Sequence, residues 1–400
     1  MLDFFERNVK MSEIIAIICE YNPFHSGHKI QINKIKESFP KSKIIAIMSG
    51  NCTQRAELAI MDKYSRAEAA VICGVDAVFE IPYPYSSSNA EVFAKAGVYI
   101  ASSLGATHLC FGSETGEIDY LKDIADTIDS ENFANAISLA LKEKGISYPR
   151  AREKALIKLG KSIPNTPNDI LGVEYLRAIK SIDSSIIPIV IKRKGSSYKD
   201  YEISDIMSAG AIRKFFYKKG KFISVPEDVL DVYKREQNEG KILNEEALDD
   251  FIHKYLLLAI ADDFETIYDT LPGMSHFILN VAKEASSGKE FFEKLTSKSY
   301  THSRLRRVIF YMMFKVKKIE EMPSYTTLLS SNSCGRVIVK NAKKANKINI
   351  LTKVANYKKL DPVSINQAEM SLKMDKFHIS FMRSPSVQND VFKKQPFLKK

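Results

Sequence analysis

The chain has 400 residues, of which 45% are hydrophobic and 27% charged, as in ordinary folded proteins. No apolar run approaches the roughly 18 residues that a membrane-spanning helix needs, and residues 1–10 lack the long apolar stretch of a signal peptide. We therefore expect no membrane partner, and we interpret residues 1–10 as a short extension before Met11. Five cysteines without a CxxC pair predict neither a disulfide framework nor a zinc site and fit a reducing, cytoplasmic location.

The formal net charge of +11 is concentrated at the C-terminal end of the chain. Residues 331–400 hold 15 Lys and Arg against four Asp and Glu, whereas the other residues hold 44 of each sign. A local excess of this kind suits a polyanion such as nucleic acid. The alternative interpretation is a solvated tail without a partner.

Short apolar runs alternate with helical patterns through the first half of the chain. The runs that predict strands are 14–19, 43–48, 77–81, 108–111 and 186–191. Helices are predicted from Gly27 onward, over 62–73 with Asp62 as N-cap, and over 90–104. This alternation predicts an α/β fold, a doubly wound parallel sheet whose strands are covered on both faces.

The pattern changes near residue 201, where a mostly helical C-terminal region is predicted. The expected helices are 205–220, 227–237, 245–270, 274–287, 289–298 and 302–319. After about residue 320 the pattern is mixed, with short apolar pieces at 336–339 and 348–351. We therefore predict two domains, an α/β domain over 1–200 and a mostly helical region with a basic tail over 201–400.

The motif with the most chemical content is EYNPFHSGH, residues 20–28, which joins the first predicted strand to the first helix. Gly27 permits close approach of a ligand, and a helix N-terminus offers free N–H groups and partial positive charge. His25 and His28 lie three residues apart, on one face of the first turn. We predict that both are catalytic, donating hydrogen bonds to ATP phosphates and stabilising the charge that develops as pyrophosphate leaves.

Three further motifs are ambiguous when taken alone. Asn168 precedes a helix, where an N-cap role is the ordinary alternative to ligand binding. Arg193 follows a strand, and such an arginine reaches a phosphate or simply faces solvent. The stretch 208–213 begins a helix with a serine, which suits either a cap or a phosphate.

A basic and aromatic cluster surrounds Arg304 and Arg307, which share one helical face. Tyr and Phe side chains interleave with these cations, a combination suited to single-stranded RNA. A solvated amphipathic helix is the alternative. In the basic tail the RNA-binding candidates are Lys343, Lys344 and Lys347.

The motifs together resemble the bacterial tRNA(Met) cytidine acetate ligases of the HxGH nucleotidyltransferase superfamily. The resemblance rests on IAIICEYNPFHSGHKIQI, QRAELAI, DKYSRAEAA, GVDAVFEIP, HLCFGSE, PNDILGVEYLRAI and IKRKGSSYKD, which follow one another in the family's order. It implies that ATP activates acetate as acetyl-adenylate, and that the acetyl group is transferred to N4 of the wobble cytidine of elongator tRNA(Met). The ATP contacts that it implies are Ile18, Cys19, Glu20, Tyr21, Asn22, Pro23, Phe24, His25, Ser26, Gly27, His28, Gly112, Asn168 and Arg193.

No dedicated metal site is expected, because the chain shows no carboxylate pair or His/Cys cluster, and Mg²⁺ would arrive with ATP. Two stretches depart from the family pattern, Cys52-Thr53 in the NCTQRAELA loop and Lys199 in place of a histidine. Two other functions remain open. One is an adenylyltransferase acting on a small phosphate-bearing acceptor, and the other is a non-catalytic RNA-binding protein.

Overall fold

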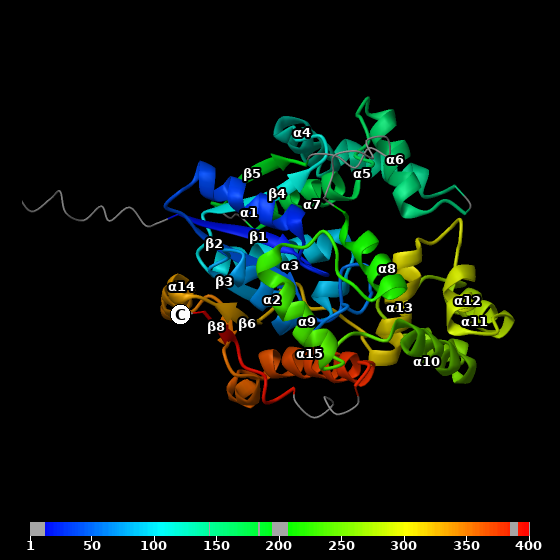
Figure 1. The fold of residues 1–400 in the computed structure, drawn as a ribbon. Helices are drawn as coiled ribbons and strands as arrows, with labels where there is room; N and C mark the ends of the chain where they lie inside the picture. Colours follow the sequence, from blue (N-terminus) through cyan, green and yellow to red (C-terminus); the bar gives the residue numbers. More distant parts are fainter. Residues whose placement is uncertain (1–12, 144, 183–184, 194–206, 385–390, 400) are drawn as a thin grey trace, which may run out of the picture.

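The computed structural model describes residues 13–143, 145–182, 185–193, 207–384 and 391–399 (Figure 1). Residues 1–10 and Lys199, which carried expectations from the sequence, lie outside these ranges. Within them, no helix combines the length and hydropathy needed to cross a bilayer.

One eight-stranded sheet forms the centre of the protein (Figure 1). Its strands are β1 (Ile14–Cys19), β2 (Lys43–Ser49), β3 (Ala77–Ile81), β4 (His108–Ser113), β5 (Ile187–Lys192), β6 (Tyr325–Ser331), β7 (Asn349–Leu351) and β8 (Phe397–Leu398). The spatial order is β5-β4-β1-β2-β3-β6-β7, with β8 beside β6. The first five strands are parallel, and the five strand positions predicted from the sequence are confirmed to within two residues.

The strand order reverses at β1, because β2 and β3 continue on one side of β1 while β4 and β5 continue on the other. In open parallel sheets a ligand binds beyond the carboxyl ends of the strands at such a reversal. The crevice between the ends of β1 and β4 is therefore where the topology favours a ligand.

Helices cover both faces of the sheet and produce two apolar cores. One core contains residues of α1 (Ser26–Ser38), α2 (Lys63–Ile72), α8 (Ala209–Lys219) and α9 (Leu230–Asn238). The other contains residues of α3 (Ala90–Ser103), α4 (Ile118–Ile128), α5 (Glu131–Ala140), α6 (Tyr148–Lys158), α7 (Pro167–Ser181) and α14 (Ser333–Ala345). The predicted doubly wound α/β class is confirmed.

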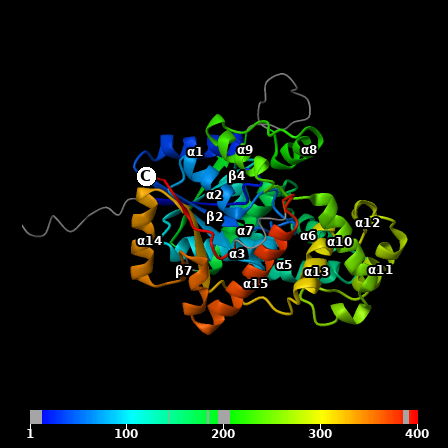
Figure 2. The same cartoon turned by 60° about the horizontal axis from the view of Figure 1, so that its bottom comes forward.

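A third core joins the helices of the second half of the chain to the residues that follow β2 and β3. These helices are α10 (Glu245–Leu258), α11 (Met274–Glu284), α12 (Gly288–Lys294), α13 (His302–Phe314) and α15 (Pro362–Ser380). Short 3₁₀ turns occur at Tyr85–Ser87, Glu227–Val229, Ala261–Phe264 and Val354–Lys359. Figure 2 shows α15 lying between α14 on one side and α10–α13 on the other.

Several helices end before the predicted position: α11 ends at Glu284 and not at 287, and α12 ends at Lys294 and not at 298. Two others end early for a reason that the structure shows. The single helix expected over 245–270 is wrong: α10 ends at Leu258, Ala259 is extended, and the Asp263 carboxylate accepts the Ile260 N–H to begin a new turn. The helix expected over 302–319 ends at Phe314, because Lys315 adopts a left-handed conformation with φ 56°.

The last quarter of the chain contributes strands that the sequence did not predict. Strand β6 pairs antiparallel with β3, and β7 and β8 pair parallel with β6. Arg336–Val339, one of the short apolar pieces, lies within α14. The division at residue 200 stays a prediction, while the sheet itself is built from both halves.

The fully buried side chain of Arg66 on α2 connects the loops that follow β1 and β2. Its guanidinium donates to the carbonyl oxygens of Glu20 at 2.5 Å and Gly50 at 2.5 Å, to that of Ser49 at 3.3 Å, and through Nε to that of Met61 at 3.1 Å. Burial lowers its pKa to about 10. The guanidinium remains charged at neutral pH and orders the carboxyl ends of two central strands.

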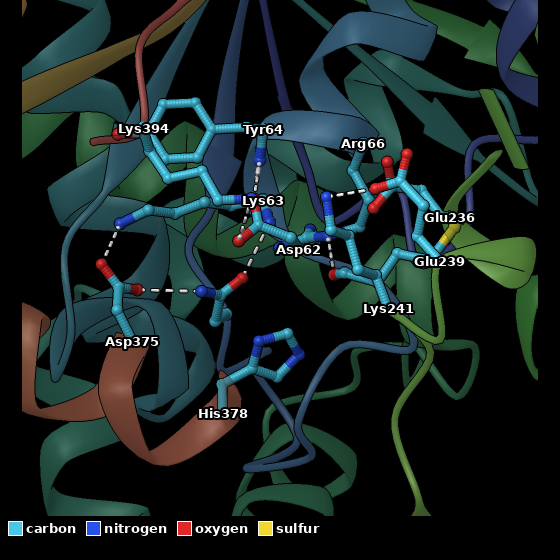
Figure 3. A network of polar contacts seen from close by, with 12 residues as sticks. Asp62, Lys63, Tyr64, Arg66, Glu236, Glu239, Lys241, Asp375, His378 and Lys394 are labelled. Carbon is cyan, nitrogen blue, oxygen red and sulfur yellow. Dashed lines mark hydrogen bonds and ion pairs between the residues drawn. The ribbon is translucent and has the colours of Figure 1, made fainter. Parts of the chain in front are cut away.

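A second buried network attaches α15 to the same region (Figure 3). Lys63 Nζ lies 2.6 Å from Glu80 and 2.7 Å from Asp375, and all three side chains are almost completely buried. Asn51 completes the network, donating to Asp375 at 2.9 Å and accepting the Lys63 N–H at 2.8 Å. Nearby, the predicted N-cap Asp62 is confirmed, since it accepts the Tyr64 N–H.

Replacing Arg66 with methionine is expected to lower the free energy of unfolding by about 4 kcal/mol. The change leaves buried carbonyl oxygens without a donor, and each such group costs roughly 1–3 kcal/mol. Urea unfolding followed by circular dichroism measures the loss. The matched control is Lys95→Met, which removes an exposed ion pair with Glu321 and is expected to cost less than about 1 kcal/mol. Equal losses in the two variants would contradict the role given to Arg66.

Candidate functional site: the loop between β1 and α1

The loop after β1 places two histidines at the start of α1. His25 is the N-cap residue, and its Nδ1 accepts the Gly27 N–H at 3.1 Å. In return, His28 Nδ1 accepts the His25 N–H at 3.2 Å. The two imidazoles stack with their ring centroids 3.8 Å apart. Reciprocal capping of this kind fixes both rings relative to the helix N-terminus.

These hydrogen bonds determine where each imidazole carries its proton. Burial, assisted by the charge of Arg193, lowers the pKa of His25 to about 4. Burial and the neighbouring His25 hold the pKa of His28 well below its usual range. Both rings are therefore neutral at pH 7, and because each Nδ1 accepts a hydrogen bond, the proton resides on each Nε2. The site thus holds two oriented Nε2–H donors.

Packing around the loop fixes the rings further. The ring of Tyr21, which is buried, meets His28 edge-on with centroids 4.7 Å apart, and buried Phe24 packs against both rings. The Asn22 side chain accepts the Ile60 N–H at 2.9 Å. The side chains of Tyr21, Asn22 and Phe24, all predicted to contact ATP, thus contact other protein groups. They determine the conformation of the loop.

The other candidate ATP residues gather beside this loop, at the ends of β4 and β5. A Cβ atom on Gly112 would lie only 3.1 Å from Arg193 Cγ. A glycine at this position therefore lets the Arg193 side chain pack directly over the backbone of β4. The Arg193 N–H donates to the Ser113 carbonyl at 2.9 Å. Asn168, in the first turn of α7, donates to Glu114, which follows β4 directly. Residues far apart in the chain thus meet at the carboxyl ends of β4 and β5.

Residues of the second half of the chain hydrogen-bond to the backbone of the loop between β1 and α1. Arg213 on α8 donates to the Asn22 carbonyl at 2.8 Å and pairs with Glu57 at 2.9 Å. Tyr233 on α9 donates to the Phe24 carbonyl, and the Ser26 N–H donates to the Ser224 carbonyl. At 208–213, Ser208 acts as the N-cap of α8, and Arg213 bonds to protein groups. Contact with phosphate by this stretch stays a prediction.

The candidate RNA-binding residues fall on two separate surfaces. Arg304 and Arg307, on α13, both pair with Asp269, and Arg307 is buried. Lys343, Lys344 and Lys347 are exposed at and just after the C-terminal end of α14, which lies at the opposite end of the molecule from α13 (Figures 1 and 2). The structure does not bring these two groups together.

Sequence reasoning did not select three residues as candidates, two beside this loop and one in the basic cluster of α13. Arg66 orders the loops and Glu114 holds Asn168, as described above. Arg306 lies between the two paired arginines of α13, with its guanidinium carbon 4.2 Å from the centre of the Phe292 ring. Among the described residues it has no ion pair, and its buried Nε has no hydrogen-bond partner. Two of these residues carried a signal in the sequence. Arg66 is an arginine on the apolar face of the predicted helix in DKYSRAEAA, and Glu114 is a glutamate directly after a predicted strand.

With this geometry established, the chain can be compared with known proteins. The sequence model of the HIGH Nucleotidyl Transferase family matches residues 12–394. A tRNA(Met) cytidine acetate ligase of Caldanaerobacter subterraneus is 38% identical over 367 residues, covering 86% of this chain and 90% of the relative. The same-named protein of Clostridium novyi is 35% identical and covers 93% and 98% of the two chains. This chain belongs to the tRNA(Met) cytidine acetate ligase family.

The fold agrees with that membership. The crystal structure of Thermotoga maritima TmcAL bound with alpha-thio ATP matches with a TM-score of 0.89 and 30% sequence identity, covering 97% of this chain and all of that chain. The structure of the same protein without ligand matches equally well. The resemblance stated from the motifs is thereby confirmed.

The loop that departs from the ligase family's pattern folds tightly. Cys52 is buried and pairs with Leu58 in an antiparallel bridge, and the Thr53 N–H donates to the Glu57 carbonyl. Ala56 at its tip has φ 55°. The Gln54 N–H reaches Glu20 at 2.9 Å, so the loop still contacts the first motif. In the described ranges, no group of three His, Cys, Asp or Glu side chains is arranged to hold a metal ion.

The pKa of His25 predicts how its protonation affects stability. That pKa is about 4 in the folded protein and near 6.5 when unfolded, so the unfolded state binds more protons between these values. The free energy of unfolding of the wild type should therefore fall as pH decreases from 6.5 towards 4. His25→Asn keeps an N-cap acceptor but has no titrating group.

Relative to His25→Asn, the wild type is expected to lose up to about 1.4 kcal/mol per pH unit in this range. Urea unfolding of both proteins at several pH values provides the measurement. Parallel stability curves for the two proteins would show that His25 is not held neutral.

Proposed function

We propose that this protein is an ATP-dependent ligase that activates acetate as acetyl-adenylate and acetylates N4 of the wobble cytidine of elongator tRNA(Met). The observation that carries the proposal is the pair of Nε2–H donors, His25 and His28, at a helix N-terminus in the β1–β4 crevice of a chain 38% identical to a named ligase. A tRNA substrate also suits a cytoplasmic location.

The proposed first half-reaction joins an acetate oxygen to the α-phosphorus of ATP and breaks its bond to pyrophosphate. Negative charge builds on the phosphate oxygens as pyrophosphate leaves. The two Nε2–H groups are donors fixed before the reaction, and the partial positive charge of the α1 N-terminus and the exposed guanidinium of Arg193 would add to the stabilisation of such charge. Neither histidine needs to accept a proton, which agrees with their lowered pKa values.

In the proposed second half-reaction, the cytidine N4 attacks the acetyl carbon, AMP leaves with the oxygen that came from acetate, and N4 loses one proton to water. The N4 lone pair is delocalised into the ring, so the amine needs an activated acyl group. Nothing at the phosphate loop requires the cytidine for the first half-reaction. We therefore infer that acetyl-adenylate forms before the tRNA reacts.

Mg²⁺ would enter with ATP, held by the phosphate oxygens and water. For the tRNA, the proposal uses the exposed lysines of α14 and the arginines of α13. Arg306 is the strongest new candidate on α13, because Arg304 and Arg307 already pair with Asp269.

Replacing either catalytic histidine should impair activation while leaving the fold intact. His25→Asn and His28→Asn each remove one Nε2–H donor, and losing one such donor costs on the order of 10²–10³ in rate. Acetate-dependent exchange of labelled pyrophosphate into ATP, measured without tRNA, reports the first half-reaction. We expect exchange in the wild type and almost none in either variant, with unchanged circular dichroism.

The outcomes distinguish the competing functions. Product formed with a small phosphate-bearing acceptor and no tRNA would favour the adenylyltransferase. A protein that acetylates tRNA but shows no exchange without it would refute independent activation only. Acetylation with acetyl-coenzyme A, and never with acetate plus ATP, would refute the ligase itself.

The basic surfaces should make tRNA binding strongly dependent on salt. If about six phosphates are contacted, affinity should fall roughly 10³-fold between about 50 and 200 mM salt. Changing Lys343, Lys344 and Lys347 together to glutamine, or Arg306 to glutamine alone, should weaken tRNA binding and leave ATP binding unchanged. Filter binding at several salt concentrations provides the measurement, and a flat salt response would rule out these surfaces.

A further inference from the structure

We propose that Glu114 is a positioning residue that fixes the amide of Asn168, and that this amide recognises the adenine base of ATP. The inference rests on the proposed function only in taking ATP as the nucleotide. Such recognition would make the site prefer ATP to GTP. The two histidines cannot cause this preference, because the phosphates of the two nucleotides are identical.

The Glu114 carboxylate is held on both of its oxygens. Asn168 Nδ2 donates to Oε1 at 2.5 Å, and the Thr166 hydroxyl lies 2.9 Å from Oε2 and 2.8 Å from Asp169 Oδ2, so it shares its one proton between the two carboxylates. The backbone of Glu114 is fixed as well, because its N–H donates to buried Asp169 at 3.1 Å. Asp169 also accepts from the Ser113 hydroxyl, which orders the turn after β4. The carboxylate therefore has one position from which to direct Asn168.

A carboxylate can only accept hydrogen bonds, so its contact with Asn168 must be made by the amide nitrogen. The carbonyl oxygen Oδ1 and the second N–H of the Asn168 amide take no part in this contact. Among the described residues, Asn168 makes no other side-chain hydrogen bond, and it is only half-buried. The amide thus leaves one acceptor, Oδ1, and one N–H donor for a ligand.

The position of Asn168 determines which part of a nucleotide it meets. Helix α7 packs against β4, and Asn168 in its first turn is hydrogen-bonded to Glu114, the residue that follows β4. The proposed phosphate donors, His25 and His28, follow β1, the strand that pairs with β4. A nucleotide whose phosphates bind at α1 and which extends from the end of β1 towards the end of β4 brings its nucleoside part to Asn168.

Adenine is complementary to this amide and guanine is not. Adenine carries an amino donor at C6 beside a ring-nitrogen acceptor, the pattern that asparagine reads with two hydrogen bonds. Guanine has an oxygen acceptor at C6, which would face Asn168 Oδ1 with no proton between them. If Glu114 keeps the amide in its present orientation, GTP is rejected at this contact.

The test is Glu114→Gln with ATP and GTP binding measured separately by titration calorimetry. A glutamine both donates and accepts, so it permits Asn168 to rotate and present its nitrogen to the base. We expect ATP affinity to fall, and the ratio of ATP to GTP affinity to fall by about ten- to a hundredfold. Glu117→Gln is the matched control, since Glu117 is exposed and makes no side-chain cap hydrogen bond, and its ratio should equal that of the wild type.

A second variant, Asn168→Ala, removes the amide while keeping Glu114 and should reduce the ratio to a similar extent. Equal loss of ATP and GTP affinity in both variants would overturn the inference, because it would place Asn168 on the ribose or a phosphate. An unchanged ratio would overturn it as well. A wild type that prefers ATP but does not acetylate tRNA would refute the proposed function and leave this inference intact.

Discussion

The site depends on one buried cation, the guanidinium of Arg66. Two parallel strands end side by side at the carboxyl edge of the sheet, and the carbonyl oxygens that follow them have no strand partner. Arg66 supplies donors to both loops at once, from a helix that itself packs on the sheet. Because a buried carbonyl without a donor is costly, the geometry of the histidine loop is coupled to the stability of the core. The loop that carries His25 and His28 is thus held in place by an arginine that is itself fully buried.

The two halves of the chain share this region. Arg213 and Tyr233 come from the second half, yet they bind carbonyls of the loop that carries His25. The buried Lys63 network adds Asp375 from α15 at the ends of β2 and β3. Removing one partner of such a network leaves an uncompensated buried charge. The loop that carries His25 and the helical half of the chain are thus joined by polar contacts with little tolerance for change.

Local patterns predicted the parts of the fold that are locally determined. Apolar runs located the five parallel strands, and the string around His25 and His28 identified the loop before α1. Strand β6 was missed because YTTLLSS is buried on both faces and shows neither alternation nor a continuous apolar run. The Glu114–Asn168 contact spans 54 positions, and the pairing of Arg304 and Arg307 with Asp269 spans more than 30. Such contacts follow from tertiary packing, which a single sequence does not display.

The pairing of β6 with β3 also constrains the order in which the protein is made. Thr326 on β6 bonds to the Glu80 carbonyl on β3, 246 positions earlier in the chain. During synthesis the first five strands emerge long before their sixth neighbour, so β3 carries an unpaired edge of buried, apolar residues through most of translation. Exposed edges of this kind template unwanted strand pairing between chains. A nascent or truncated chain that stops before residue 325 is therefore the form of this protein most prone to aggregate.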